Sequence, residues 1–125
     1  MIEDFIYLLV LITSFLQILH IFEEINLEAY NVKKGKNSKK FYYLMASILI
    51  FINFMILYFL YFKNPLAYIA SFYTVILSVG NTLAHVIMYR REEPSPVRGH
   101  GLPTSIPLGI SGIVLLIFLF LKIFN

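Results

Sequence analysis

Four long apolar segments restrict this chain to a membrane protein. A bilayer core is about 30 Å thick, so a helix that crosses it needs about 20 mostly apolar residues. Backbone groups in lipid must form their hydrogen bonds within the segment, which makes each segment an α-helix. The segments cover residues 5–29, 41–62, 66–89 and 104–124. We therefore predict an all-α integral membrane four-helix bundle that forms a single domain over residues 1–125.

The composition agrees with this assignment and narrows the chemistry. Charged residues make up 14% of the chain, against about 25% in a typical soluble domain. Cysteine is absent from the sequence, which excludes disulfides, thiol nucleophiles and thiolate metal ligands. A metal site would therefore need histidine, carboxylate or amide ligands. The first four residues lack the basic region of a signal peptide, so we expect the first segment to remain as a membrane helix.

Capping residues and prolines mark the expected helix ends. Asn64 followed by Pro65 is typical of an N-cap and the first residue of a helix. Prolines are expected to keep residues 92–103 out of a helix. Thr104 and Ser105 can then cap the fourth helix.

Basic residues predict the orientation of the bundle, because cytoplasmic loops are enriched in Lys and Arg. One side carries Lys33, Lys34, Lys36, Lys39, Lys40, Arg90, Arg91 and Arg98, and the other carries Lys63 and Lys122. We expect a multi-pass cell-membrane protein with both termini on the non-cytoplasmic side. Loops 30–40 and 90–103 would then be cytoplasmic. These loops are topology signals, and no motif supports nucleic-acid binding.

Polar side chains form a stripe on two of the predicted helices, at spacings of three and four residues. The first stripe contains Thr13, Gln17, His20, Glu24 and Glu28, with Glu23 beside it. The second contains Ser71, Thr74, Ser78, Asn81 and His85. Lipid penalises such groups, so we expect the two stripes to face the interior and each other. Their ionisable residues lie at similar depths near the cytoplasmic end.

Two motifs within these stripes resemble a known family. Residues 20–24 read H-x-x-E-E, and residues 81–85 read N-x-x-x-H. This ordered pair is similar to the HXXEE family of small polytopic membrane proteins, and the resemblance covers nearly the whole chain. It supports a shared site but implies no particular reaction. The chain departs from the family before its last helix. The family tends to carry a tyrosine-x-proline-glycine element there, and the most similar sequence in this chain is at residues 100–104.

The first interpretation of the cluster is a divalent metal site. Imidazole and carboxylate ligands suit Zn²⁺, Fe²⁺ or Mn²⁺, and residues at i, i+3 and i+4 of a helix can approach one centre. The predicted ligands are His20, Glu23, Glu24 and His85. Asn81 is expected to be a weaker ligand or to orient the others.

Two other interpretations remain open. Adjacent carboxylates near an apolar cavity can act as acid and base without a metal, with a histidine relaying protons. Alternatively, the cluster is an ion or proton relay, part of a transporter, or a polar network that fixes helix packing. We favour a metal-assisted enzyme that acts on a hydrophobic or lipid-derived substrate. Its predicted catalytic residues are His20, Glu23, Glu24, Asn81 and His85. Membrane lipids and a lipid-like ligand are the expected partners.

Most other polar residues are expected to serve packing, namely Thr13, Ser71, Thr74 and Ser78. Asn53 is expected to form an interhelical hydrogen bond, and Gln17 either packs or lines a cavity. A small-residue patch suits close packing within the chain or a homo-oligomer; it consists of Ser105, Gly109 and Gly112. Glu28 is expected to pair with Lys33 or Lys34, and His100 to lie in a loop.

Overall fold

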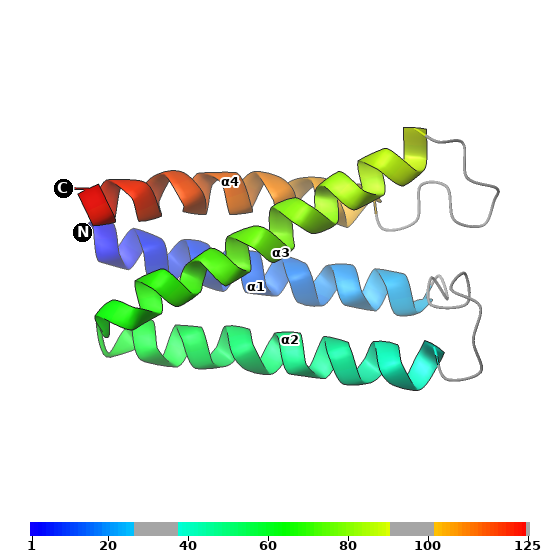
Figure 1. Cartoon of the computed structure of the whole chain (residues 1–125), viewed down its shortest axis with the longest axis horizontal. Coiled ribbons are helices and arrows are strands. Elements are labelled where there is room, and N and C mark those ends of the chain that lie inside the picture. Colours follow the sequence, from blue (N-terminus) through cyan, green and yellow to red (C-terminus); the bar gives the residue numbers. More distant parts are fainter. Residues whose placement is uncertain (27–37, 91–101, 125) are drawn as a thin grey trace.

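The computed structural model is a bundle of four helices and describes residues 1–26, 38–90 and 102–124 (Figure 1). The helices are α1 (Ile2–Asn26), α2 (Ser38–Tyr61), α3 (Pro65–Arg90) and α4 (Leu102–Phe124). All four are long and apolar enough to cross a membrane, which confirms the predicted all-α bundle. Large apolar side chains such as Phe51, Ile69 and Ile110 are more than half exposed, as expected of a surface that faces lipid.

The observed helix ends lie within a few residues of the predicted ones. α1 begins at Ile2 rather than at residue 5, and residues 27–29 lie outside the described part of the chain. α4 begins at Leu102, so Pro103 lies inside a helix that the sequence predicted to begin two residues later. A helix tolerates proline in its first turn, because the N–H that proline lacks would have no partner there.

α4 packs against both α1 and α3. α1 and α4 run antiparallel, and their contacts extend along their whole length through Glu3–Lys122, Thr13–Ser111 and His20–Thr104. α1 begins and α4 ends at one end of the bundle, which we call the termini end (Figure 1). The opposite end, where α1 and α3 end and α2 and α4 begin, we call the site end. α3 starts beside α2 at the termini end and diverges from it toward the site end (Figure 1).

Small residues allow the close approach of α3 and α4. A Cβ atom added to Gly109 would lie 2.5 Å from Thr82 Oγ1, and one added to Gly112 would overlap the Ser78 side chain. The Thr82 hydroxyl also donates a hydrogen bond to the Ser105 carbonyl of α4. The small-residue patch of α4 therefore packs within the chain, which was one of its two predicted roles.

Side-chain hydrogen bonds link the helices in the middle of the bundle. Asn53 Nδ2 of α2 donates to Gln17 Oε1 of α1 over 2.8 Å. Thr74 Oγ1 of α3 donates to Asn53 Oδ1 over 2.9 Å. This confirms the interhelical bond predicted for Asn53. α4 also reaches this region, because Thr13 of the first predicted stripe donates a hydrogen bond to the Ser111 hydroxyl of α4.

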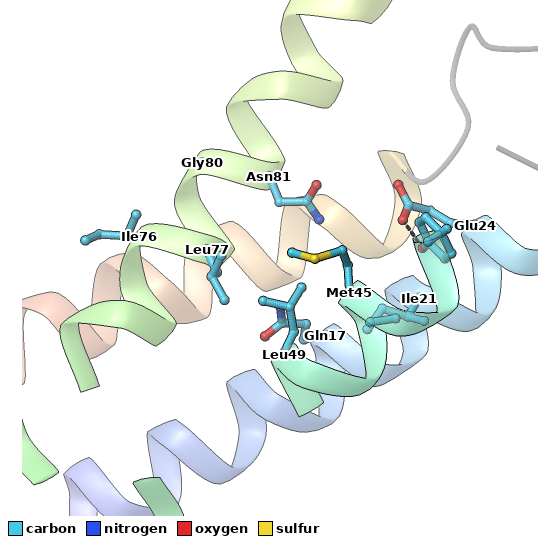
Figure 2. Close-up of a pocket in the computed structure, with 11 residues that line it drawn as sticks. Gln17, Ile21, Glu24, Met45, Leu49, Ile76, Leu77, Gly80 and Asn81 are labelled. Carbon is cyan, nitrogen blue, oxygen red and sulfur yellow. Dashed lines mark hydrogen bonds between the residues drawn. The ribbon is translucent and has the colours of Figure 1, made fainter. Parts of the chain in front are cut away.

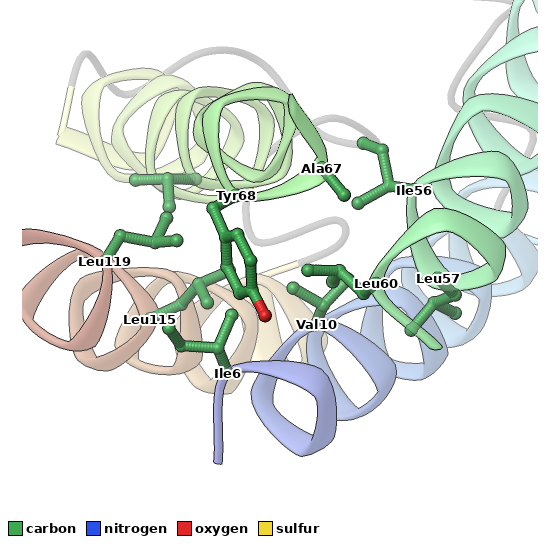
Figure 3. Close-up of a cluster of buried hydrophobic side chains, with 10 residues drawn as sticks. Ile6, Val10, Ile56, Leu57, Leu60, Ala67, Tyr68, Leu115 and Leu119 are labelled. Carbon is green, nitrogen blue, oxygen red and sulfur yellow. The ribbon is translucent and has the colours of Figure 1, made fainter. Parts of the chain in front are cut away.

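The termini end is held together by apolar packing. Its core includes Ile6, Val10, Leu60, Ala67, Tyr68, Leu115 and Leu119, which come from all four helices (Figure 3). At its rim, Glu3 accepts a 2.6 Å hydrogen bond from Lys122 and lies 3.6 Å from Lys63. Apolar contacts therefore hold the termini end together, whereas the two buried histidines of the described residues lie at the site end.

A tight turn joins α2 to α3 at the termini end. Lys63 has a φ of 54°, and the bonds Lys63 N to Leu60 O and Asn64 N to Phe59 O close the end of α2 as a Schellman motif. Asn64 Oδ1 then accepts a hydrogen bond from the Leu66 N–H. Asn64 is thus the N-cap of α3, as its position before Pro65 predicted.

Candidate metal centre

Three ionisable side chains converge at the site end of the bundle. His20 and Glu24 lie one turn apart on α1, and His85 comes from α3. His20 Nε2 and His85 Nε2 are 3.2 Å apart, and Glu24 Oε1 lies 3.4 Å from the first and 3.3 Å from the second. These three atoms form a nearly equilateral triangle. Both histidines are buried, and 18% of the Glu24 side chain is exposed.

The size of this triangle fits a tetrahedral metal site. Zinc bonds to nitrogen and oxygen are about 2.0–2.1 Å long, which places adjacent tetrahedral ligands about 3.3 Å apart. Two imidazoles and one glutamate form the ligand set of several catalytic zinc sites, whose fourth position holds water or substrate. His20, Glu24 and His85 can therefore hold a divalent metal ion while one position stays free. We call these three residues the metal triangle.

α2 contributes a contact to the second oxygen of the glutamate. The Tyr42 hydroxyl donates a hydrogen bond to Glu24 Oε2, which is drawn as a dashed line in Figure 2. This contact leaves Oε1 facing the two imidazoles. Tyr42 therefore fixes the carboxylate so that a single oxygen is presented to the metal triangle.

α4 contributes a contact to the far side of His20. His20 Nδ1 lies 2.8 Å from Thr104 Oγ1, and the Thr104 hydroxyl donates a hydrogen bond to the Glu23 carboxylate. An ionised carboxylate only accepts hydrogen bonds, so the hydroxyl proton points to Glu23 and the hydroxyl oxygen accepts from His20 Nδ1–H. The proton of a neutral His20 then sits on Nδ1. The lone pair of Nε2 is thereby directed into the metal triangle, as in histidine ligands of metals.

The structure brings three of the five predicted site residues together and places the other two beside them. Successive residues of an α-helix point about 100° apart. Glu23 therefore faces Thr104 of α4, while Glu24 faces α2 and α3. Asn81 lies one turn before His85 and lines a cavity (Figure 2). Glu28 and His100 lie outside the described residues.

A cavity of about 360 Å³ adjoins the metal triangle between α1, α2 and α3. Its walls include Gln17, Glu24, Tyr42, Leu49, Ile76 and Asn81 (Figure 2). We call it the lateral cavity. Since Glu24 belongs to both the cavity wall and the metal triangle, a molecule in the cavity would lie beside the candidate metal ligands. Gln17 lines this cavity and also binds Asn53, so it fills both roles considered for it.

No protein-family model matches this chain, and neither a curated protein nor a solved structure matches it. The resemblance to the HXXEE family stays a prediction from its two motifs.

Sequence reasoning missed two residues of the site. Thr104 was expected to cap α4, and Tyr42 was not singled out. A signal existed for each of them, because both lie within the first two turns of helices that begin at the site end. In an up-and-down bundle these turns must lie level with the end of α1, where the H-x-x-E-E motif stands.

Replacing Thr104 with valine is expected to weaken zinc binding by about 10- to 100-fold, which is typical when a group that orients a metal ligand is lost. Valine keeps the shape of threonine but cannot accept the His20 Nδ1–H. The dissociation constant is measured by competition with a chromophoric chelator in detergent. Thr82→Val is the matched control, because it removes a neighbouring α3–α4 hydrogen bond in which no residue of the metal triangle takes part. Equal losses in both variants would contradict a specific role for Thr104.

Proposed function

We propose that this protein is a membrane-embedded, metal-dependent enzyme that acts on a hydrophobic or lipid-derived substrate. The observation that carries the proposal is the triangle of His20 Nε2, His85 Nε2 and Glu24 Oε1, with sides of 3.2 to 3.4 Å. Ionisable groups inside a membrane are costly and are usually functional. Two imidazoles and a carboxylate that meet at one point exceed what helix packing requires.

The ligand set suits Lewis-acid chemistry. A metal with three protein ligands and one free position can activate a bound water molecule or polarise a carbonyl oxygen. Tyr42 and Thr104 would keep the ligands oriented while the fourth position exchanges. Asn81 would contact the substrate from the lateral cavity. Hydrolysis of an ester or amide of a lipid-like molecule is the reaction class that fits this arrangement best.

The charge distribution supports a site that opens toward the cytoplasm. Lys39 and Lys40 are exposed at the beginning of α2, at the site end. Six of the other eight basic residues of the chain lie at positions 33–36 and 90–98, in or next to the sequences that connect the helices at this end. Basic residues near helix ends favour the cytoplasmic side. The two motifs that resemble the HXXEE family contain all three residues of the metal triangle.

Metal content and activity test this proposal together. The protein is purified in mild detergent, stripped with a chelator and dialysed against Zn²⁺, Mn²⁺ or Fe²⁺. We expect one metal ion per chain and metal-dependent hydrolysis of fluorogenic acyl esters in mixed micelles. A wild-type protein that retains no metal in stoichiometric amount would contradict the proposal.

A proton relay is the second candidate function, because a continuous series of hydrogen-bonding groups crosses the site. It runs from Tyr42 through Glu24, the two imidazoles and Thr104 to Glu23. Within the metal triangle the two imidazole nitrogens are 3.2 Å apart, and their distances of 3.3 and 3.4 Å to Glu24 Oε1 are slightly longer than usual hydrogen bonds. Proteoliposomes loaded with a pH-sensitive dye separate the two functions. Proton flux through a metal-free protein would favour the relay.

A further inference from the structure

Gly80 differs from the two other glycines that lie inside described helices. Gly109 and Gly112 pack against side chains of α3, whereas a Cβ atom added to Gly80 would have nothing within 4 Å. Glycine inside a helix is less favourable than alanine, because it loses more backbone entropy on folding. Helix packing does not explain this residue. Gly80 does line the lateral cavity, where a side chain would take up space.

The lateral cavity has a polar part and an apolar part. Glu24, Tyr42 and Asn81 supply a carboxylate, a hydroxyl and an amide on the side of the metal triangle. Leu49 and Leu77 line the part that lies deeper in the bundle, together with Gln17, whose carboxamide oxygen already accepts the hydrogen bond from Asn53 (Figure 2). From Glu24 to Gln17, α1 advances by about 10 Å along its axis. The cavity therefore matches an elongated molecule with one polar end.

α2 and α3, which supply most of the lining of the lateral cavity, diverge toward the site end (Figure 1). Two of its lining residues, Met45 and Ile76, are 40% and 69% exposed. Both side chains are apolar and lie within membrane-spanning segments. Gly80 stands on the exposed surface of α3 beside them. A molecule dissolved in the bilayer can therefore reach the cavity sideways without passing through water.

We propose that the lateral cavity binds a neutral amphiphile with a single hydrocarbon chain, and that Gly80 keeps its opening clear. The volume of about 360 Å³ is near the lower limit of ligand pockets, about 300–1,000 Å³, which favours one chain over two. No Lys or Arg is among the described residues that line the cavity, so in the metal-free protein the Glu24 carboxylate disfavours an anionic head group. An ester, amide or hydroxyl group can instead bond to Tyr42 or Asn81. Only the identification of this amphiphile as the substrate rests on the proposed function.

Photolabelling with a defined probe tests this inference. The whole protein is reconstituted in phosphatidylcholine vesicles that contain a monoacylglycerol with a diazirine in its chain. We expect labelling to concentrate on peptides with Met45, Leu49 and Ile76. Gly80→Leu adds a side chain at the opening, where an added Cβ atom meets no neighbour, and should reduce this labelling about tenfold or more, as for an extra group in an apolar pocket. Ala70→Leu, at an exposed position of α3 outside the cavity, should leave it unchanged.

Each contrary outcome has its own meaning. Labelling spread evenly over the exposed faces of the helices, or unaffected by Gly80→Leu, would overturn the inference. Equal cavity labelling by a two-chain diazirine phosphatidylcholine would overturn the preference for a single chain. The same experiment on His85→Ala separates the inference from the proposed function, because the cavity should still be labelled when a metal ligand is removed. A wild-type protein that binds no metal but is labelled in the cavity overturns the enzyme and upholds the binding site. A protein that binds metal but is not labelled in the cavity overturns the binding site and leaves the proposed enzyme standing.

Discussion

His85→Ala is expected to abolish stoichiometric metal binding by the purified protein. The substitution removes the one ligand that comes from α3 and leaves His20 and Glu24, which lie on the same helix. Loss of a group that merely orients a ligand costs about 10–100-fold in affinity, so loss of a ligand itself should cost more than about a hundredfold. Elemental analysis after dialysis against zinc measures the effect, and Glu24→Gln should act in the same direction.

Asn81→Ala provides the matched control for these variants. Asn81 lies on the same helix as His85 and was predicted as a ligand or orienting residue, but it lines the lateral cavity outside the metal triangle. We expect this variant to keep one metal ion per chain. Retention of full metal content by His85→Ala, or the same loss in Asn81→Ala as in His85→Ala, would contradict the assignment of the three ligands.

Gly112→Leu is expected to destabilise the bundle more than any other single substitution considered for this chain. The new side chain would overlap Ser78 and press on Val79 where α3 and α4 approach most closely. Overpacking of a buried contact usually costs about 1–3 kcal/mol, and more where the backbone must move. For a chain of this size such a cost lowers the melting temperature by about 5 °C or more. Thermal unfolding in detergent, followed by circular dichroism, measures it.

Gly80→Leu is the control for this prediction, because a Cβ atom added at Gly80 has no neighbouring atom within 4 Å. Its melting temperature should stay within about 2 °C of the wild type, or rise slightly as a helix glycine is removed. Since α3 carries His85 and α4 carries Thr104, separation of these helices should also reduce zinc binding in Gly112→Leu. Equal melting temperatures for the two variants would contradict the close packing of α3 and α4.

Much of the fold was predictable because membranes impose simple rules. The length of each apolar segment predicted four helices, and their observed ends differ by a few residues. The spacing of three and four residues placed His20 and Glu24 on one face of α1, where the structure has them. Polar groups avoid lipid, so the stripes on α1 and α3 had to turn inward. Asn53, isolated in an apolar helix, had to find a partner for the same reason.

The remainder of the site depends on helix rotation and crossing, which no local sequence signal encodes. The lateral cavity is lined by residues of α2 and α3, which diverge toward the site end, and Asn81 is one of its lining residues. Close packing of α4 brings Thr104 to both Glu23 and His20. These arrangements follow from which side chains fit between helices that are distant in sequence. Spacing on α1 alone could not decide whether Glu23, Glu24 or both would meet His85.

X-ray absorption spectroscopy of the zinc-loaded protein tests the metal triangle most directly. We expect four nitrogen or oxygen neighbours at about 2.0 Å and the multiple scattering of two imidazole rings. One of these rings should disappear in any metal that His85→Ala still retains. Zinc surrounded by oxygen atoms alone, or a wild-type protein without bound zinc, would contradict the account.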